Sequence, residues 1–214
     1  MKIFLTLLFT FSAIAGIYAD DKYEKAVKKN LDRMDTCRIS ADYLNVANAF
    51  ERIALAENGK WLPYYYASLN YVLASFVDSS KSQRDMYLDK AVGFIHTADS
   101  LVPNNSEVLT LKGMIAQARM QIDPMSRWQK YGGEAQFNFQ KAMETDSLNP
   151  RPEYLIGAGV FYTPKQFGGG PDKAKPILEN SWRKFEQFVP ANNLMPIWGK
   201  QMVGELLERI NEVK

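Results

Sequence analysis

The chain has 214 residues, of which 46% are hydrophobic and 23% charged, and this composition indicates one folded domain or one repeat array rather than a disordered chain. Its 26 basic and 24 acidic residues give a net charge of +2. A chain this close to neutral lacks the excess of Lys and Arg that nucleic-acid binding requires, so we expect no nucleic-acid partner. Its single cysteine excludes an internal disulfide framework.

Residues 1–19 have the layout of a cleavable secretory signal. Lys2 supplies the basic start, and the apolar stretch 3–17 is shorter than the ~20 residues of a membrane-spanning helix, which argues against the alternative of a retained anchor. Small residues at cleavage spacing predict a cut after Ala15 or Ala19, and we favour Ala19 because charged residues follow it. We therefore expect an exported protein, in the periplasm or, alternatively, secreted.

The remaining chain, residues 20–214, is predicted to be one helical repeat domain without a stable membrane span. Its apolar residues follow helical spacing, sustained two-residue alternation is absent, and turn-forming residues recur at short intervals. The fold class is therefore all-α. Helices are expected, in chain order, at 22–38, 41–57, 62–77, 82–101, 105–121, 132–145, 151–162, 172–188 and 194–212.

A small–large–small pattern recurs on alternate helices. Ala91, Ile95 and Ala98 lie four and then three residues apart, on one helix face. Alanines allow two helix axes to approach closely, and the larger residue between them fills the remaining space. A glycine inside a helix costs about 1 kcal/mol relative to alanine, so its presence at a fixed offset indicates close packing. The residues assigned to this packing are Ala49, Ile53, Ala56, Ala91, Ile95, Ala98, Gly113, Ala135, Phe139, Ala142 and Gly157, with a further copy at Ala174, Leu178 and Ser181.

The order Ala-x3-Phe-x2-Ala, a helix-stopping residue and then Leu or Ile with Gly resembles the tetratricopeptide repeat (TPR) family. The match is best over 84–121 and 132–162, weaker over 41–76 and degenerate over 171–212, and the tryptophan that opens a typical repeat is absent. The resemblance implies a TPR-like α-solenoid of about four helical hairpins plus a C-terminal capping helix. A looser resemblance, to exported bacterial proteins with Asn-Pro-Arg, Thr-Pro-x-x-Phe-Gly-Gly-Gly and Pro-x-Trp-Gly motifs (149–151, 163–170 and 196–199), implies no particular activity.

No group of residues suggests catalysis. His96 is the single histidine, so neither a histidine metal cluster nor a histidine pair can be built, and we expect no metal site and no cofactor. The glycines at 168–170 lack the spacing of a phosphate-binding loop and are interpreted as a bend before a helix. Cys37 is interpreted as a buried apolar residue, with a reactive or intermolecular thiol as the alternative. The protein is therefore not expected to be an enzyme.

A helical solenoid offers a concave surface that the first helix of each hairpin lines. Residue types enriched at binding surfaces lie on these helices. The predicted partner-binding groove consists of Tyr65, Ser68, Glu107, Thr110, Met114, Gln117, Arg151, Tyr154 and Phe161. The competing interpretation is that these side chains pack against neighbouring helices.

These features favour an exported scaffold that binds a protein or peptide partner in the cell envelope through the concave groove, an expectation that rests on analogy of fold. The alternative is a periplasmic small-ligand-binding or transport-accessory protein, which requires a pocket with converging polar groups near Arg151 and Tyr154.

Overall fold

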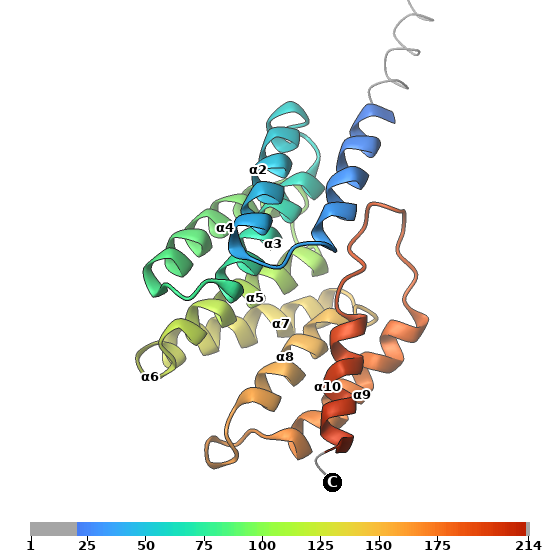
Figure 1. Ribbon diagram of the computed structural model, residues 1–214. Coiled ribbons are helices and arrows are strands. Elements are labelled where there is room, and N and C mark those ends of the chain that lie inside the picture. Colours follow the sequence, from blue (N-terminus) through green and yellow to red (C-terminus); the bar gives the residue numbers. More distant parts are fainter. Residues whose placement is uncertain (1–20, 213–214) are drawn as a thin grey trace, which may run out of the picture.

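The computed structural model describes residues 21–212, and over this range the chain is built of helices and the turns that join them, with no β-strand (Figure 1). The all-α prediction is therefore confirmed. The predicted signal over 1–19 and its cleavage sites lie outside the described residues. No helix between residues 21 and 212 combines the length and the apolar character needed to cross a membrane.

The first described helix covers residues 21–34. The elements that follow are α2 (Ser40–Ala56), α3 (Trp61–Val77), α4 (Lys81–Leu101), α5 (Ser106–Ile122), α6 (Pro124–Arg127), a π-helical turn (Trp128–Gly132), α7 (Gly133–Thr145), α8 (Arg151–Tyr162), a 3-10 turn (Lys165–Phe167), α9 (Pro171–Gln187) and α10 (Lys200–Glu212).

Local sequence explains where several helices begin. Asn105 accepts hydrogen bonds at its side-chain oxygen from the backbone N–H groups of Glu107 and Val108, and so caps the start of α5. Asn104, just before it, has φ 58°, a turn conformation that asparagine tolerates better than most residues. At α9, Pro171 occupies the first turn, where its missing N–H costs nothing.

Three elements differ from the predicted ones. The first helix ends at residue 34 rather than at 38. The last helix starts at Lys200 rather than at 194, since residues 190–199 form turns and Gly199 adopts φ 113°. The short α6 and the π-helical turn occupy 124–132, where a loop was expected. Here Arg127 forms two hydrogen bonds of 2.7 and 2.8 Å to the carboxylate of Asp85 on α4, so a contact distant in sequence orders this stretch.

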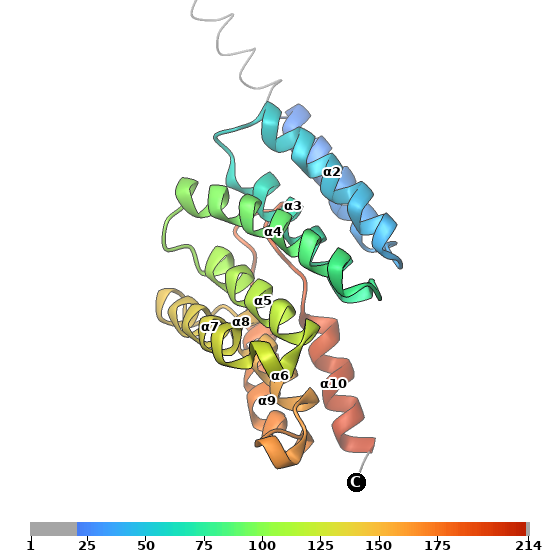
Figure 2. The ribbon, with the colours of Figure 1, turned by 90° about the vertical axis from the view of Figure 1, so that its left-hand side faces the viewer.

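The helices pack as antiparallel hairpins. Within the described range, α3 packs on α4, α5 on α7 and α8 on α9, while α10 packs on α9 as a cap. Figures 1 and 2 show the first helix beside α2 as a further hairpin. The first helices of successive hairpins also contact one another, α3 with α5 and α5 with α8, and we call α3, α5 and α8 the inner row. This arrangement confirms the predicted solenoid of hairpins.

Two glycines lie where first and second helices of a hairpin cross. A Cβ atom on Gly113 of α5 would lie 2.5 Å from Cδ1 of Phe139 on α7, and one on Gly157 of α8 would lie 2.7 Å from Cδ2 of Leu178 on α9. Phe139 and Leu178 are the large members of their small–large–small sets, and both are buried. Within the weaker N-terminal copy, by contrast, Ala56 is exposed, so its predicted role in close helix packing is not supported.

The segment between α9 and α10, residues 188–199, extends from the C-terminal helices toward the N-terminal half of the molecule and returns to α10 (Figure 1). Leu194 at its far end is buried in the main hydrophobic core, and its carbonyl accepts a hydrogen bond of 2.6 Å from the Tyr66 hydroxyl of α3. We call residues 188–199 the C-terminal strap. It ties the last hairpin to the second one.

Candidate functional site

The strap lies on the inner row, over the surface predicted to be the partner-binding groove. Seven of the predicted groove residues are buried in the folded chain: Tyr65, Ser68, Glu107, Thr110, Met114, Gln117 and Arg151. Tyr154 and Phe161 are half-buried. The helices do bring these residues together along one surface, but that surface is covered, as the competing interpretation allowed.

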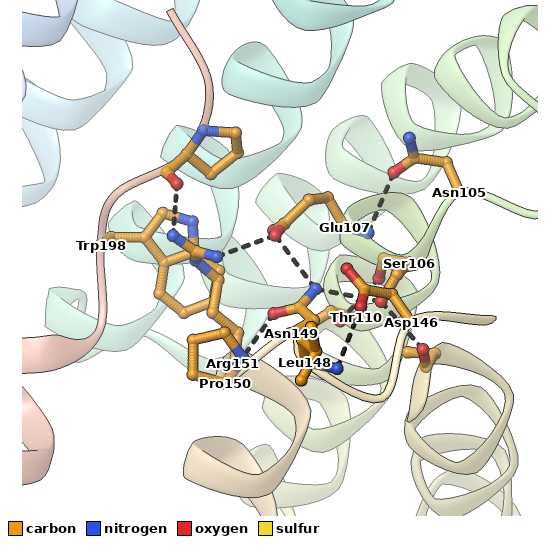
Figure 3. A network of polar contacts seen from close by, with 12 residues as sticks. Asn105, Ser106, Glu107, Thr110, Asp146, Leu148, Asn149, Pro150, Arg151 and Trp198 are labelled. Carbon is orange, nitrogen blue, oxygen red and sulfur yellow. Dashed lines mark hydrogen bonds and ion pairs between the residues drawn. The ribbon is translucent and has the colours of Figure 1, made fainter. Parts of the chain in front are cut away.

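A buried polar network joins the strap to this surface (Figure 3). Arg151 of α8 is 0% exposed, and its Nη1 donates to Oε1 of Glu107 on α5 at 2.8 Å. Its Nη2 donates to the carbonyl oxygen of Pro196 in the strap. Trp198 of the strap donates from Nε1 to the hydroxyl of Tyr65 on α3, at 2.9 Å. Three helices of the inner row and the strap are thus held by one set of contacts.

The charges in this network are neutralised locally. Asn149 donates a further hydrogen bond of 3.0 Å to Glu107, and the rings of Phe188 and Trp198 flank the guanidinium of Arg151 at 4.6 and 5.4 Å. Burial raises the pKa of Glu107, and the neighbouring Arg151 opposes that rise. Because a buried charge is tolerated only when it is paired, this network is a structural joint.

Two of the motifs noted in the sequence meet at this joint. Asn149 and Arg151 belong to Asn-Pro-Arg, and Pro196 and Trp198 belong to Pro-x-Trp-Gly. The third motif lies elsewhere, in the turn after α8, where Gly170 has φ 107° and a Cβ on Gly169 would collide with the backbone of residue 163. Two of the motifs therefore connect the strap to α8, and the third forms a tight turn.

At the place near Arg151 and Tyr154 where a pocket was expected, the strap packs against both side chains. Tyr154 packs edge-to-face on Trp198, with ring centroids 6.3 Å apart. Burial raises the pKa of Tyr154 to about 12.

A pocket of about 470 Å³ opens instead between α3 and α4. Its lining is more apolar than polar and consists of Tyr64, Met86, Asp89, Lys90, Gly93, Phe94 and Thr97. We call it the α3–α4 pocket. None of these residues belongs to the predicted groove.

The spacing of residues on α4 explains how the pocket forms. Leu88, Ala91, Ile95 and Ala98 form the buried face of this helix. Met86, Lys90, Gly93 and Thr97 follow one another at steps of four, three and four residues, and so line a different face, which is turned toward the pocket. The face of an amphipathic helix opposite its buried face is turned to solvent, and on α4 this face supplies most of the pocket lining.

Aromatic rings form one wall of the pocket. The ring of Phe94 stacks on Tyr71 at a centroid distance of 6.0 Å and an interplanar angle of 10°, and it lies 6.4 Å from the ring of Tyr64. Tyr71 is in turn fixed by a hydrogen bond of 2.6 Å from its hydroxyl to Glu51 of α2. The wall is thus held in place by contacts from α2 and α3.

The described residues contain no group of three or more His, Cys, Asp or Glu side chains that could hold a metal ion. The pocket lining includes the thioether of Met86 and the phenol of Tyr64. His96 is exposed on α4 and does not line the pocket. Cys37 is buried, and burial raises the pKa of its thiol.

Sequence reasoning missed the pocket because it searched the first helix of each hairpin, whereas α4 is a second helix. A detectable signal was present. Met86, 58% exposed, and Gly93 lie on the face of α4 opposite to its alanines, where a packing role does not explain them.

Comparison with known proteins shows an informative similarity to a solved structure. No protein-family model and no curated protein matches the chain, so the TPR resemblance extends only to the arrangement of helical hairpins. Among solved structures, the chain is similar to the HusA haemophore from Porphyromonas gingivalis, with 31% sequence identity and a TM-score of 0.79. The alignment covers 90% of this chain and 94% of the haemophore.

This similarity corrects two expectations. A haemophore, by its name, is a carrier of haem, which is a small ligand. The predicted function as a scaffold for a protein or peptide is therefore wrong, as is the predicted protein or peptide partner, and the alternative of a small-ligand-binding protein fits better. The covered inner row gives the physical reason for the correction, since the strap already occupies the groove. At this identity over nearly the full length of both proteins, the chain belongs to the family of the HusA haemophore.

Proposed function

We propose that this protein is a haem carrier that acts outside the cytoplasm, in the cell envelope or beyond it. The observation that carries the proposal is the 31% identity to the HusA haemophore over 94% of that protein. The predicted secretory signal over 1–19 agrees with a place of action outside the cytoplasm. Carriage requires binding and release only, and we assign the protein no enzymatic activity.

The α3–α4 pocket is the proposed haem site. Its volume of about 470 Å³ falls within the range of about 300–1,000 Å³ that is usual for small-molecule sites. A flat ring system such as haem is well suited to pack against the aromatic wall of Tyr64 and Phe94, because aromatic rings stack favourably in offset or edge-to-face arrangements. Met86, which also lines the pocket, offers a flexible and polarisable contact.

A titration with haem, followed through the Soret absorption band, tests the proposal. We expect the wild type to bind haem in saturable fashion, and we expect Met86→Ala to weaken binding by roughly 3–10-fold, which corresponds to about 1 kcal/mol at a contact residue.

The matched control is Met125→Ala. Met125 is 81% exposed and lies outside the pocket, so the same substitution there should leave haem affinity unchanged. A wild-type protein without a saturable Soret change would refute the proposed function. Equal losses in the two variants would place the haem site elsewhere.

A further inference from the structure

Gly93 is a glycine in the middle of α4 for which the fold gives no reason. A mid-helix glycine costs about as much helix propensity as any residue but proline. At Gly113 the ring of Phe139 leaves no room for a Cβ atom, and at Gly157 the side chain of Leu178 does the same. At Gly93, a Cβ atom would meet nothing within 4 Å, and φ of Gly93 is not positive. Neither packing nor backbone conformation therefore requires glycine here.

What Gly93 does provide is an uncovered stretch of helix backbone inside the pocket. Absence of a side chain lets a ligand approach the backbone closely. Lys90 precedes Gly93 by one turn and Thr97 follows it by one turn, on the same face. The Thr97 hydroxyl donates to the carbonyl oxygen of Gly93 at 3.3 Å, which satisfies that polar group within the helix. At Gly93 the pocket lining therefore has no side chain and a satisfied carbonyl group, which suits contact with an apolar ring face.

The pocket also presents an uncommitted positive charge. Two charged residues line it, Asp89 and Lys90. Nη2 of Arg119 on α5 pairs with the Asp89 carboxylate at 2.6 Å, so this negative charge is neutralised. None of the ion pairs or side-chain hydrogen bonds found within residues 21–212 involves the ammonium group of Lys90. A carboxylate on a ligand would provide the partner that the protein does not.

We propose that Gly93 and Lys90 together select the ligand class: a flat ring that lies on the α4 backbone at Gly93 and carries a carboxylate at its edge for Lys90. Haem, a planar macrocycle with two propionate groups, has this chemistry. The inference rests on the proposed function and adds to it the residues that recognise the ring face and the acid group.

Substitution of Gly93 separates this role from a structural one, since stability and binding should change in opposite directions. Gly93→Ala should raise the melting temperature by about 2–4 °C, because alanine favours the helix and its Cβ has space. The same variant should weaken haem binding by roughly 3-fold, and Gly93→Leu by more than about 10-fold, since a side chain at this position lifts the ring.

Gly133→Ala and Gly133→Leu serve as controls, because Gly133 is exposed, has open space at its Cβ and lies outside the pocket. They should bind haem as the wild type does. If Gly93→Leu also binds haem with wild-type affinity, the inference is overturned.

The role of Lys90 is tested with haem and haem dimethyl ester, whose acid groups are blocked. Lys90→Gln should weaken haem binding by about 3–10-fold and leave binding of the ester unchanged. Lys141→Gln, at an exposed lysine of α7 away from the pocket, is the matched control and should change neither. Equal losses for haem and its ester, or no loss for haem, would overturn the assignment of Lys90.

Failure of this inference can be told apart from failure of the proposed function. If the wild type and the Gly93 and Lys90 variants all bind haem equally tightly, the proposed contacts of Gly93 with the ring and of Lys90 with the carboxylate are wrong, and the proposed function stands. If the wild type binds neither haem nor metal-free protoporphyrin, both proposals fall.

Discussion

Arg151 shows how a single residue type can suggest a binding site and instead serve the fold. Arginine is common at binding surfaces, and here its guanidinium is fully buried between Glu107, the Pro196 carbonyl and the ring of Trp198. Its guanidinium donates to an acid and to a backbone carbonyl while its planar faces pack against aromatic rings, a combination that the ammonium group of a lysine does not offer. Residue type alone does not distinguish these two uses.

We therefore expect Arg151→Met to destabilise the fold by about 3–5 kcal/mol, because it leaves the carboxylate of Glu107 buried without its cation. The double variant Arg151→Met/Glu107→Gln should recover part of this loss, since the unpaired charge is gone. Urea unfolding of the wild type, both single variants and the double variant measures the coupling. Strictly additive losses would contradict the buried pair.

At the scale of the element, the two kinds of helical glycine carry different information. Gly113 of α5 lies against the ring of Phe139, which is buried at the crossing with α7, whereas Gly93 of α4 faces open space. The sequence pattern identified Gly113 and Gly157 because each stands at a fixed offset after the alanines of the preceding hairpin. Gly93 has no such partner, and only the tertiary structure shows that no atom lies near the position of its Cβ.

Gly113→Ala should accordingly destabilise the protein by about 1–3 kcal/mol, because its Cβ overpacks the helix crossing, whereas Gly93→Ala should stabilise it. Thermal unfolding of the two variants side by side provides the comparison. A rise in melting temperature for both would show that the α5–α7 crossing tolerates a methyl group, contrary to the geometry.

At the scale of the whole molecule, the C-terminal strap determines which surface of the helices is covered. Its Leu194 carbonyl and the Tyr66 hydroxyl are separated by 128 positions in the chain, and Trp198 reaches Tyr65 over 133. These contacts cover the inner row, whereas the α3–α4 pocket lies outside the surface that the strap covers. Most residues of this pocket lie on α4, the second helix of its hairpin. The binding surface of a solenoid was instead expected on the first helix of each hairpin.

Much of the architecture followed from the sequence by itself. Helices α2, α3, α4, α5, α8 and α9 begin and end within one or two residues of the predicted limits, because periodicity, prolines and capping residues act locally. The succession of hairpins followed for the same reason, from small residues at crossings.

Tertiary structure alone decided which surface is available. A turn-rich segment such as 188–199 has no periodicity, so its path over the inner row depends on contacts with α3 and α8 that no local pattern encodes. The same holds for the α3–α4 pocket, whose wall requires Tyr64, Tyr71 and Phe94 from two helices. Local free energies determine helices, whereas burial of segments far apart in the chain determines which helix faces remain open to a ligand.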